Sequence, residues 1–290
     1  MHRPVLRAEV LGFLAGRDVR LFLDATVGLG GHARAVLEAH PEAGVVGIDR
    51  DVEMVMVARE RLEEFGTRAR VVQAPFSALG RVLGDLGAGA PDAILMDLGV
   101  SSPQLDTRER GFSFRADAPL DMRMDRGDPD TAADLVNRLP EAALADLIFT
   151  LGDERHSRRI AAAIARERRK EPIRTTGRLA DIVRGAVRGR GRIDAATRTF
   201  LALRIAVNRE LDELREGLDA AAERLAPGGR LLVISFHSGE DRIVKEFFRS
   251  DARLAVLTKK VVRPADAEAR ENPRARSAKM RVAERRKAVA

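Results

Sequence analysis

The first 97 residues alternate between short apolar runs and helical patterns, and this alternation restricts the fold more than any other feature of the sequence. The apolar runs lie about 25 residues apart and are rich in β-forming residues; they are residues 21–26, 44–49, 69–73 and 93–97, with helical patterns at 32–40 and 52–65. Strands joined by helices pair in parallel, and right-handed crossovers place helices on both faces of the sheet. The sequence therefore predicts a doubly wound, mostly parallel α/β sheet.

The alternation stops after residue 97 and resumes near residue 231. Residues 101–130 are rich in Pro, Gly, Asp and Arg without a clear period, which predicts a loop or a set of turns. Helices are then predicted by their apolar spacing; they are 132–139, 141–151, 153–169, 177–187 and one continuous helix over 195–225. A buried strand is predicted at 231–236, and the last strands at 254–262 and 280–282. We therefore expect a discontinuous sheet domain, residues 1–107 and 211–290, interrupted by a helical domain, residues 108–210.

The chain of 290 residues contains no Cys, and this absence excludes several chemistries. Disulfides, thiolate-held zinc, iron–sulfur clusters and cysteine nucleophiles are all excluded. Among methyl transfers, attack on a pyrimidine ring carbon usually needs a cysteine, and radical methylation needs a Cys-bound cluster, so direct transfer to nitrogen or oxygen remains. The five His residues have no metal-ligand spacing, and we expect no catalytic metal.

No apolar run approaches the ~20 residues that a membrane span requires. The first residues lack the apolar stretch of a signal peptide. We therefore expect a cytoplasmic protein without membrane contact.

Basic residues are concentrated in the predicted helical domain. The whole chain has a formal net charge of +7, and residues 155–192 alone carry 13 Arg and Lys against 3 acidic residues. Such a cluster predicts a nucleic-acid face, and the basic tail 274–287 is a second candidate for phosphate contacts. The alternative is a solvated surface that reflects an Arg-rich composition.

A glycine loop follows the first predicted strand and opens the first helix. Its glycines, Gly28, Gly30 and Gly31, allow a tight turn and a close approach of the backbone to a ligand. Asp49 ends the second strand, where a carboxylate can accept hydrogen bonds from both ribose hydroxyls of an adenosine. The pair fits NAD as well as S-adenosylmethionine, and a plain turn with a surface Asp is the structural alternative. Phe76, after the third strand, is expected either beside an adenine ring or in the core.

Two later features favour S-adenosylmethionine over NAD. The turn Pro227-Gly228-Gly229 precedes an apolar strand, as in S-adenosylmethionine-dependent methyltransferases of this fold. Asp97 ends the fourth strand, where such enzymes hold the acceptor. An NAD-linked oxidoreductase remains the alternative, supported only by the glycine loop and Asp49.

The segment after Asp97 is suited to an amino acceptor. Amino groups on nucleobases are poor nucleophiles because the nitrogen lone pair is delocalised into the ring, and a carboxylate with nearby carbonyls can hold the N–H groups. Ser102-Pro103 partly matches the Ser/Asp/Asn-Pro-Pro-aromatic motif of amino-methylating DNA enzymes, without its second Pro and its aromatic residue. His237, after the strand 231–236, could orient the acceptor, act as a base or be a hydrogen-bonded structural residue.

The chain has no Tyr and no Trp, so a base turned out of its stack would have to pack on Phe or His. The candidates are Phe112, Phe114 and Phe236, and each could equally be an ordinary core residue. His32, inside the glycine loop, is expected to order that loop.

Taken together, the motifs resemble one family across nearly the whole chain: the small-subunit ribosomal RNA cytosine-N4 methyltransferases, also called MraW or RsmH. The segments that carry the resemblance are residues 2–6, 24–32, 49–51, 97–106, 110–114, 120–125, 197–205, 235–238 and 272–279. The chain departs from the family pattern at Gly239, where Leu is common, and at Val27 and Leu29, where Phe and Arg are common.

The resemblance implies a class I Rossmann-like methyltransferase fold with S-adenosylmethionine as cofactor. It implies methylation of the exocyclic N4 of one cytidine of 16S rRNA, at the decoding centre of the assembled small subunit. We expect direct in-line transfer without a covalent intermediate. The cofactor contacts that the resemblance implies are Gly30, Gly31, His32, Asp49, Phe76, Asp97 and Gln104. We expect Gly28, in the same loop, to contact the cofactor as well.

The remaining expectations concern the acceptor and the partner. Catalytic roles are expected for Asp97, Ser102 and His237, and substrate contacts for Phe112, Phe114, Phe236 and Arg198. The expected partner is 16S rRNA within the small subunit, bound by a monomer or a homodimer. A catalytically idle RNA-binding assembly factor is the second alternative.

Overall fold

The computed structural model describes residues 4–187 and 194–287, which form two compact units. Unit 1 comprises Met1–Gly99 and Leu211–Ala290, and unit 2 comprises Val100–Glu210. The first boundary therefore lies earlier than the predicted residue 108, and the second lies at the predicted place. Three arginines of the predicted basic segment, Arg188, Arg190 and Arg192, lie outside the described residues.

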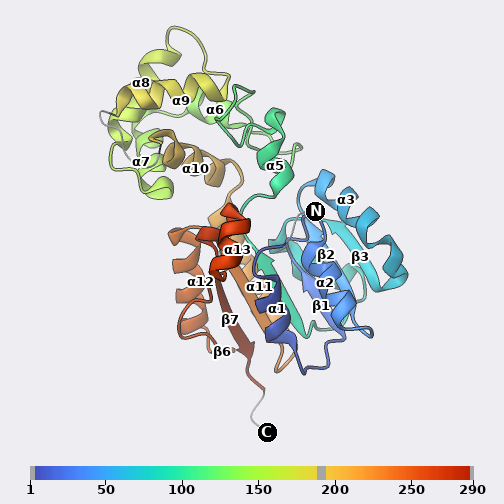
Figure 1. Cartoon of the computed structure of the whole chain (residues 1–290). Coiled ribbons are helices and arrows are strands. Elements are labelled where there is room, and N and C mark those ends of the chain that lie inside the picture. The colour runs from blue at the N-terminus through green and yellow to red at the C-terminus, as the bar shows by residue number, and fades with distance from the viewer. Residues whose placement is uncertain (1–3, 188–193, 288–290) are drawn as a thin grey trace. The chain divides into compact units, whose positions relative to one another are not determined.

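Unit 1 is built on a seven-stranded sheet. Its strands are β1 (Leu21–Asp24), β2 (Gly44–Asp49), β3 (Ala69–Gln73), β4 (Ala93–Asp97), β5 (Arg230–Ser235), β6 (Leu254–Val256) and β7 (Lys279–Arg285). Their order is β3-β2-β1-β4-β5-β7-β6 (Figure 1), and β7 alone runs antiparallel to its neighbours β5 and β6. The predicted class I, mostly parallel sheet is confirmed.

Helices cover both faces of this sheet. They are α1 (Arg7–Leu14), α2 (Gly31–Ala39), α3 (Val52–Leu62), α4 (Leu79–Asp85), α11 (Glu210–Arg224), α12 (Ser238–Ser250) and α13 (Asp266–Glu271), with short 3₁₀ turns η1 (Glu63–Arg68), η2 (Phe76–Ala78) and η4 (Pro273–Ser277). Successive strand side chains point to opposite faces: Phe22 packs with α1, α2 and α3, and Leu23 packs with α4, α11 and α12. Each fully buried Leu or Phe contributes about 1.5–3 kcal/mol by leaving water, so both helix layers are held firmly.

Unit 2 is a helical unit with its own apolar core. Its elements are α5 (Ser102–Asp106), η3 (Arg108–Arg110), α6 (Ala132–Arg138), α7 (Glu141–Gly152), α8 (Ser157–Arg168), α9 (Thr176–Ala186) and α10 (Ala196–Val207) (Figure 1). The long segment before α6 is clamped by Asn208, which is fully buried. Its Oδ1 accepts from the amide of Met124 at 2.7 Å, and its Nδ2 donates to the carbonyl of Met122 at 2.8 Å.

Two secondary-structure predictions are wrong in part. Residues 101–130 are not all loop, because Ser101 and Gln104 form a capping box that starts the five-residue helix α5. The helix predicted over 195–225 breaks at Asn208 and Arg209, where Arg209 has φ 50°. Asn208 is the C-cap residue of α10, and its side chain bonds both the preceding loop and the carbonyl of Arg204 at this break.

The end of the chain also differs from its prediction. The strand predicted over 254–262 ends at Val256, and Val262 makes only an isolated bridge with Met280. Within the described ranges, no helix combines the length and apolar character that a membrane crossing needs.

Candidate active site

Three aspartates end three neighbouring parallel strands of unit 1. Asp24 ends β1, Asp49 ends β2 and Asp97 ends β4. The register aligns Asp24 with Gly47 of β2 and with Leu95 of β4, so all three carboxylates project at the same edge of the sheet. This edge is where ligands bind in open α/β sheets.

The glycine loop connects this edge to α2. Gly30 is the N-cap residue of α2 with φ 77°, and no side chain caps the helix. A Cβ on Gly30 would lie 3.3 Å from Leu62 Cγ, so both conformation and space favour glycine. Since the first amides of a helix have no partner within it, the start of α2 can donate to a ligand.

Asp49 holds the glycine loop and has acceptor capacity left. Its Oδ2 accepts from the amide of Gly28 at 2.9 Å, and its Oδ1 accepts from the amide of Asp51 at 2.9 Å. Burial raises the pKa of Asp49 to about 6, which the two amide hydrogen bonds only partly oppose. Each oxygen of the ionised carboxylate can accept a further hydrogen bond, so two vicinal hydroxyls could bind there.

His32 and Asp97 carry buried polar atoms without partners. His32, in the first turn of α2, is 6% exposed, and its Nε2 lies 3.7 Å from Asp97 Oδ2, beyond hydrogen-bond distance. Within the described part of the chain, both ring nitrogens of His32 and Oδ1 of Asp97 have no hydrogen-bond partner. Such atoms are rare in native structures, and a bound ligand is one physical reason for them.

Phe76 lies at the start of η2, where its ring packs against α11. A Cβ on Gly217 of α11 would overlap Phe76 Cδ2 and Cε2, so the ring fits only because residue 217 is glycine. Phe76 is partly buried against the second core of unit 1. Its accessible part leaves the predicted adenine contact possible.

Ser102 and Gln104 belong to unit 2 and begin α5. Gln104 is 4% exposed, and its Oε1 accepts from the amide of Ser101 at 2.9 Å. Ser102 is the first residue of the helix and is half-buried. The capping box gives Gln104 a local role that the sequence analysis did not predict.

The aromatic candidates of unit 2 differ in exposure. Phe112 is buried in the helical core, 8% exposed. The ring of Phe114 packs edge-on against Phe200 at 4.7 Å between centroids, and the guanidinium of Arg184 lies 5.6 Å from its centre. Phe114 is only partly buried, so of the two it is better placed to meet a base.

Arg198 lies on the exposed side of α10. Its Nη1 donates to the carbonyl of Asp153 at 3.1 Å, which ties α10 to the end of α7. The remaining guanidinium donors are available for a polar ligand.

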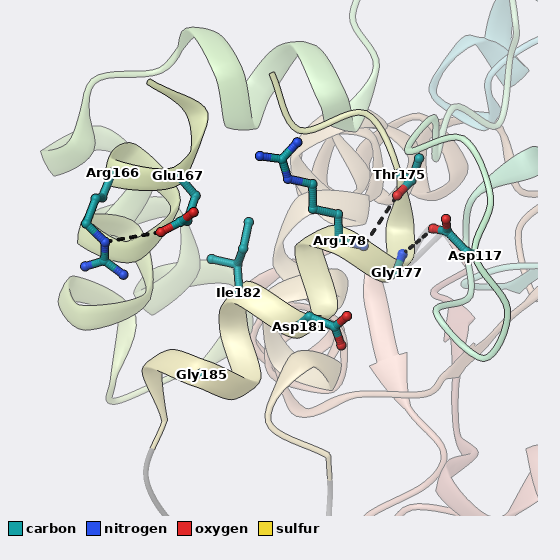
Figure 2. Close-up of a pocket in the computed structure, with 9 residues that line it drawn as sticks. All are labelled: Asp117, Arg166, Glu167, Thr175, Gly177, Arg178, Asp181, Ile182 and Gly185. Atoms are coloured by element: carbon teal, nitrogen blue, oxygen red, sulfur yellow. Dashed lines mark hydrogen bonds and ion pairs between the residues drawn. The ribbon is translucent and has the colours of Figure 1, made fainter. Parts of the chain in front are cut away.

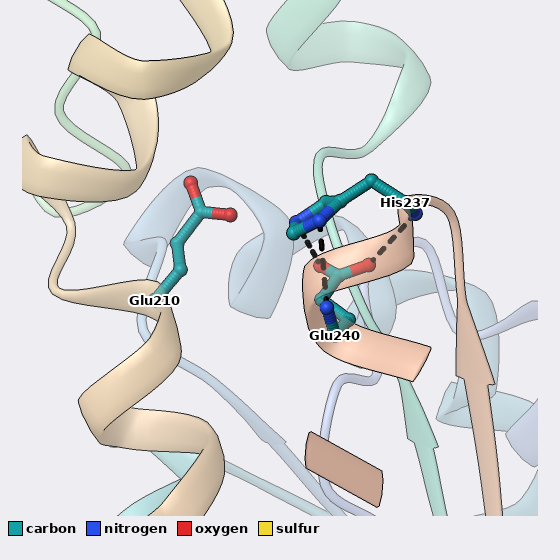
Figure 3. Close-up of side chains that lie close together, drawn as sticks. All are labelled: Glu210, His237 and Glu240. Atoms are coloured by element: carbon teal, nitrogen blue, oxygen red, sulfur yellow. Dashed lines mark hydrogen bonds and ion pairs between the residues drawn. The ribbon is translucent and has the colours of Figure 1, made fainter. Parts of the chain in front are cut away.

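His237 is the N-cap residue of α12 (Figure 3). Its Nδ1 accepts from the amides of Gly239 and Glu240 at 3.2 and 3.4 Å, and its Nε2 lies 3.2 Å from Glu240 Oε1. Glu240 in turn accepts from the amides of Phe236 and His237 at 2.8 and 3.2 Å. His237 therefore caps its own helix, and Phe236 is partly buried beside it against the first core of unit 1.

Two residues at the same edge, Asp24 and Thr26, were not among the site residues predicted from the sequence. Asp24 is 1% exposed and its Oδ1 accepts from the amide of Thr26 at 3.3 Å. Burial raises the pKa of Asp24 to about 7, with His32 opposing and Asp97 adding to the shift. The position of Asp24 at the end of the first strand, equivalent to those of Asp49 and Asp97, was the available signal.

Unit 2 contains an open depression of about 680 Å³ on α8 and α9 (Figure 2). The charges around it are largely neutralised locally: Arg178 pairs with Glu171 at 2.6 Å, and Arg166 with Glu167 at 3.3 Å. Asp117 accepts from the amide of Gly177 at 2.8 Å. The depression therefore offers little unpaired charge to a ligand.

The basic segment of unit 2 divides into paired and unpaired side chains. Arg184 pairs with Asp181 and Asp194, and Arg168 donates to the carbonyl of Val136. Among the described residues of the basic segment, 155–187, five arginines are exposed without any side-chain partner; they are Arg155, Arg158, Arg159, Arg169 and Arg174. These five are the candidate phosphate contacts of unit 2.

Several arginines of the basic tail, residues 274–287, bind other parts of unit 1. Arg281 of β7 pairs with Asp241 at 2.7 Å, and Arg285 donates to the carbonyls of Glu223 and Leu225. Arg286 donates to the carbonyl of Leu254 at 3.0 Å. These contacts hold the antiparallel edge of the sheet, so the predicted phosphate role of the tail loses much of its support.

Comparison with known proteins identifies relatives over the whole chain. A profile of the MraW methylase family matches residues 1–286. A ribosomal RNA small subunit methyltransferase H from Geobacter sulfurreducens is 52% identical, with 98% of each chain covered. A protein of the same name from a Methylobacterium species is 51% identical over 100% of this chain and 92% of its own.

Proposed function

The chain belongs to the MraW methylase family and is an S-adenosylmethionine-dependent methyltransferase, and we propose that it methylates the small-subunit ribosomal RNA. Its proposed acceptor is the exocyclic N4 of one cytidine of 16S rRNA at the decoding centre. The observation that carries this proposal is the open start of α2 beside the unpartnered atoms of His32 and Asp97. A cytoplasmic location and a monomer or homodimer remain predictions.

The residues at the sheet edge fit the cofactor. The uncapped amides of α2 suit its carboxylate, and Asp49 has acceptor capacity for the two ribose hydroxyls. The partly accessible ring of Phe76 suits the adenine. When bound, S-adenosylmethionine supplies a methyl group on a positively charged sulfur, ready for in-line displacement.

Asp97 suits the amino acceptor. Its Oδ1 is buried without a partner, and its side chain is 24% exposed, so it can reach a ligand at the edge. A carboxylate that accepts an N–H of the amino group orients the nitrogen lone pair toward the methyl group. It also stabilises the positive charge that develops on N4 before a proton leaves.

The other predicted catalytic residues have less support from the geometry. His237 uses Nδ1 for its own helix, so we propose that it positions the start of α12. Ser102, at the start of α5, remains a proposed acceptor contact. Of the two aromatic candidates in unit 2, Phe114 is more exposed than Phe112 and is the better proposal for stacking on the base.

We propose that the start of α8 contacts rRNA phosphates. Arg155, Arg158 and Arg159 lie at or before its first turn, where positive charge is disfavoured by the helix dipole. Helix stability therefore does not explain these arginines, whereas a polyanionic partner does. They are exposed and unpaired among the described residues.

Replacing Arg155, Arg158 and Arg159 together by Gln should weaken binding to small subunits and reduce its salt dependence. Each lost phosphate contact lowers the slope of log Kd against log salt by about 0.7–0.9. The matched control is Arg178→Gln with Arg184→Gln, because both side chains are neutralised by acidic partners. Filter binding across a salt series measures the slopes; equal slopes for the two variants would contradict the proposed RNA face.

The proposed activity is tested with small subunits that lack the modification. The protein and methyl-labelled S-adenosylmethionine should transfer label to one nucleoside, recovered as N4-methylcytidine after nuclease digestion. Large subunits serve as the negative control. Binding to the subunit without any label transfer would identify an idle assembly factor, and label on another nucleoside would reject the proposed acceptor.

A further inference from the structure

Thr26 links the first strand to Asp97 where the regular ladder between β1 and β4 ends. The ladder aligns Asp24 with Leu95, and the amide of Ala25 donates to the carbonyl of Leu95 at 2.9 Å. The next amide on that side of β4 belongs to Asp97. It donates to the side-chain Oγ1 of Thr26 at 2.7 Å.

The hydroxyl oxygen of Thr26 therefore accepts the hydrogen bond that a backbone carbonyl would accept if the ladder between β1 and β4 continued. A side-chain acceptor can be removed by substitution without changing the backbone, so this hydrogen bond can be tested alone. It holds the backbone of Asp97 on the β1 side, and the pairing of Asp97 with Ile234 of β5 holds it on the other. The Cα–Cβ direction of Asp97, and hence the aim of its carboxylate, depends on both attachments.

The side chain of Asp24 holds the backbone of Thr26. Its Oδ1 accepts from the amide of Thr26 at 3.3 Å, across a two-residue turn that begins at the end of β1. Asp24 is 1% exposed, so no bulk water competes for this contact. The chain of contacts runs from Asp24 through Thr26 to Asp97, and it ends beside the ring of His32, whose nitrogens have no partner.

We propose that Thr26 is a positioning residue for methyl transfer: its hydroxyl oxygen holds the amide of Asp97 and so aims the Asp97 carboxylate at the acceptor. Asp24 assists by holding the amide of Thr26. This proposal rests on the proposed function, because it assigns Asp97 to the acceptor amino group. It adds a residue that touches neither the acceptor nor the reacting atoms.

The test compares Thr26→Val with Thr26→Ser. Val has nearly the shape of Thr without the hydroxyl, whereas Ser keeps the hydroxyl without the methyl group. Small displacements of a catalytic group can reduce a rate by up to about 100-fold. We expect Thr26→Val to lower kcat for subunit methylation at least ~10-fold with little change in KM, and Thr26→Ser to stay within about threefold of the wild type.

Three further measurements separate positioning from a general structural role. Thermal unfolding and calorimetry with S-adenosylmethionine should show that Thr26→Val remains folded and binds cofactor within about threefold of the wild type. The substitution Asp97→Asn should lower kcat to a similar level whether residue 26 is Thr or Val, because both changes act on the same carboxylate.

The outcomes distinguish this proposal from the proposed function. If the wild type transfers no methyl group to the subunit, the proposed function fails and the positioning role fails with it. If the wild type is active and Thr26→Val has an unchanged kcat, only the positioning role is overturned. Loss of activity in Thr26→Ser equal to that in Thr26→Val would also overturn it, since the hydroxyl would then be irrelevant.

Discussion

The helices α2 and α12 both begin at the carboxyl edge of the sheet, but their first turns are built in opposite ways. At α12, His237 accepts from two amides of the first turn, and Glu240 accepts from two amides just before it. At α2, the N-cap is Gly30 and no side chain fills that place. In the part of the chain that the structure describes, His237 of α12 accepts at Nδ1 and leaves only Nε2 without a hydrogen-bond partner, whereas both ring nitrogens of His32 in α2 lack partners.

This difference indicates which helix start is reserved for a ligand. A missing side-chain cap costs about 1 kcal/mol, and each buried polar atom without a partner costs about 1–3 kcal/mol. These costs are larger at α2, which lacks a side-chain cap and lies beside three unpartnered buried atoms of His32 and Asp97, than at α12, where among the described residues His237 leaves only Nε2 unpartnered. A ligand that supplies an anionic group and polar contacts would offset them, so we infer that the open start of α2 is the ligand site and that the capped start of α12 has a structural role.

The largest expected effect follows from changing Asp97 at the open end. Asp97→Asn keeps the shape of the side chain but removes the negative charge, so it should lower kcat by about 100-fold or more. Cofactor affinity should change much less, because Asp49 and the α2 amides remain. Single-turnover methylation of small subunits, with calorimetry as the control, measures both; a rate within about threefold of the wild type would remove Asp97 from the chemistry.

An intermediate effect is expected from the protonation of Asp49. Burial raises the pKa of Asp49 from 3.8 to about 6, so the ionised carboxylate is disfavoured in the protein without cofactor. The free-energy cost of burying this charge therefore grows as the pH rises from 3.8 through 6. Ribose hydroxyls donate to the ionised carboxylate, so cofactor binding is strongest above pH 6. Below that value, affinity should fall by up to about tenfold per pH unit.

Asp49→Asn provides the control for this pH dependence. The neutral amide should bind S-adenosylmethionine about tenfold more weakly at pH 8 and lose part of the decline between pH 6 and 5. Asp24, whose pKa burial raises to about 7, is present in both proteins, and Asp49→Asn removes only the smallest contribution to that shift, the charge of Asp49. Calorimetry from pH 5 to 8 measures the affinity of both proteins for S-adenosylmethionine. Parallel curves of log Kd against pH would exclude Asp49 as the titrating group.

The smallest effect is expected from changing His237, which caps the start of α12. His237→Ala should lower the free energy of unfolding by about 1 kcal/mol, whereas His237→Asn, a good capping residue, should stay near the wild type. If His237 only caps α12, the Asn variant should also retain methylation activity within a few-fold. A stable but inactive Asn variant would contradict the capping role and restore the catalytic role that the sequence suggested.

The sequence predicted the sheet and its edge well, because strand periodicity and strand ends are local signals. The positions of Asp49 and Asp97 at that edge could be predicted because each ends an apolar run. The five-residue α5 was missed, since it is too short to show a period. The break at Asn208 was missed because the apolar spacing continues across it, and the contact that Asn208 makes there, with Met124, is 84 residues away in the sequence.

Contacts between side chains also could not be predicted from the sequence. The basic cluster was visible as composition, but only the structure separates Arg184, which is paired, from Arg158, which is not. Likewise, the sequence offered His237 both a structural and a chemical role, and the positions of two amides favour the structural one. Thr26 lies in the segment 24–32 that carries the family resemblance, but nothing in the sequence indicated its contact with Asp97, because that hydrogen bond joins residues 71 positions apart.

The central claim is that the open start of α2, with Asp49 and Asp97, serves methylation of one cytidine of the small-subunit rRNA. The most direct measurement is mass spectrometry of rRNA from a strain that lacks this protein, with and without complementation. The account predicts loss of one N4-methylcytidine, restored by the wild-type chain and not by Asp97→Asn. An unchanged rRNA spectrum in the strain that lacks the protein would contradict it.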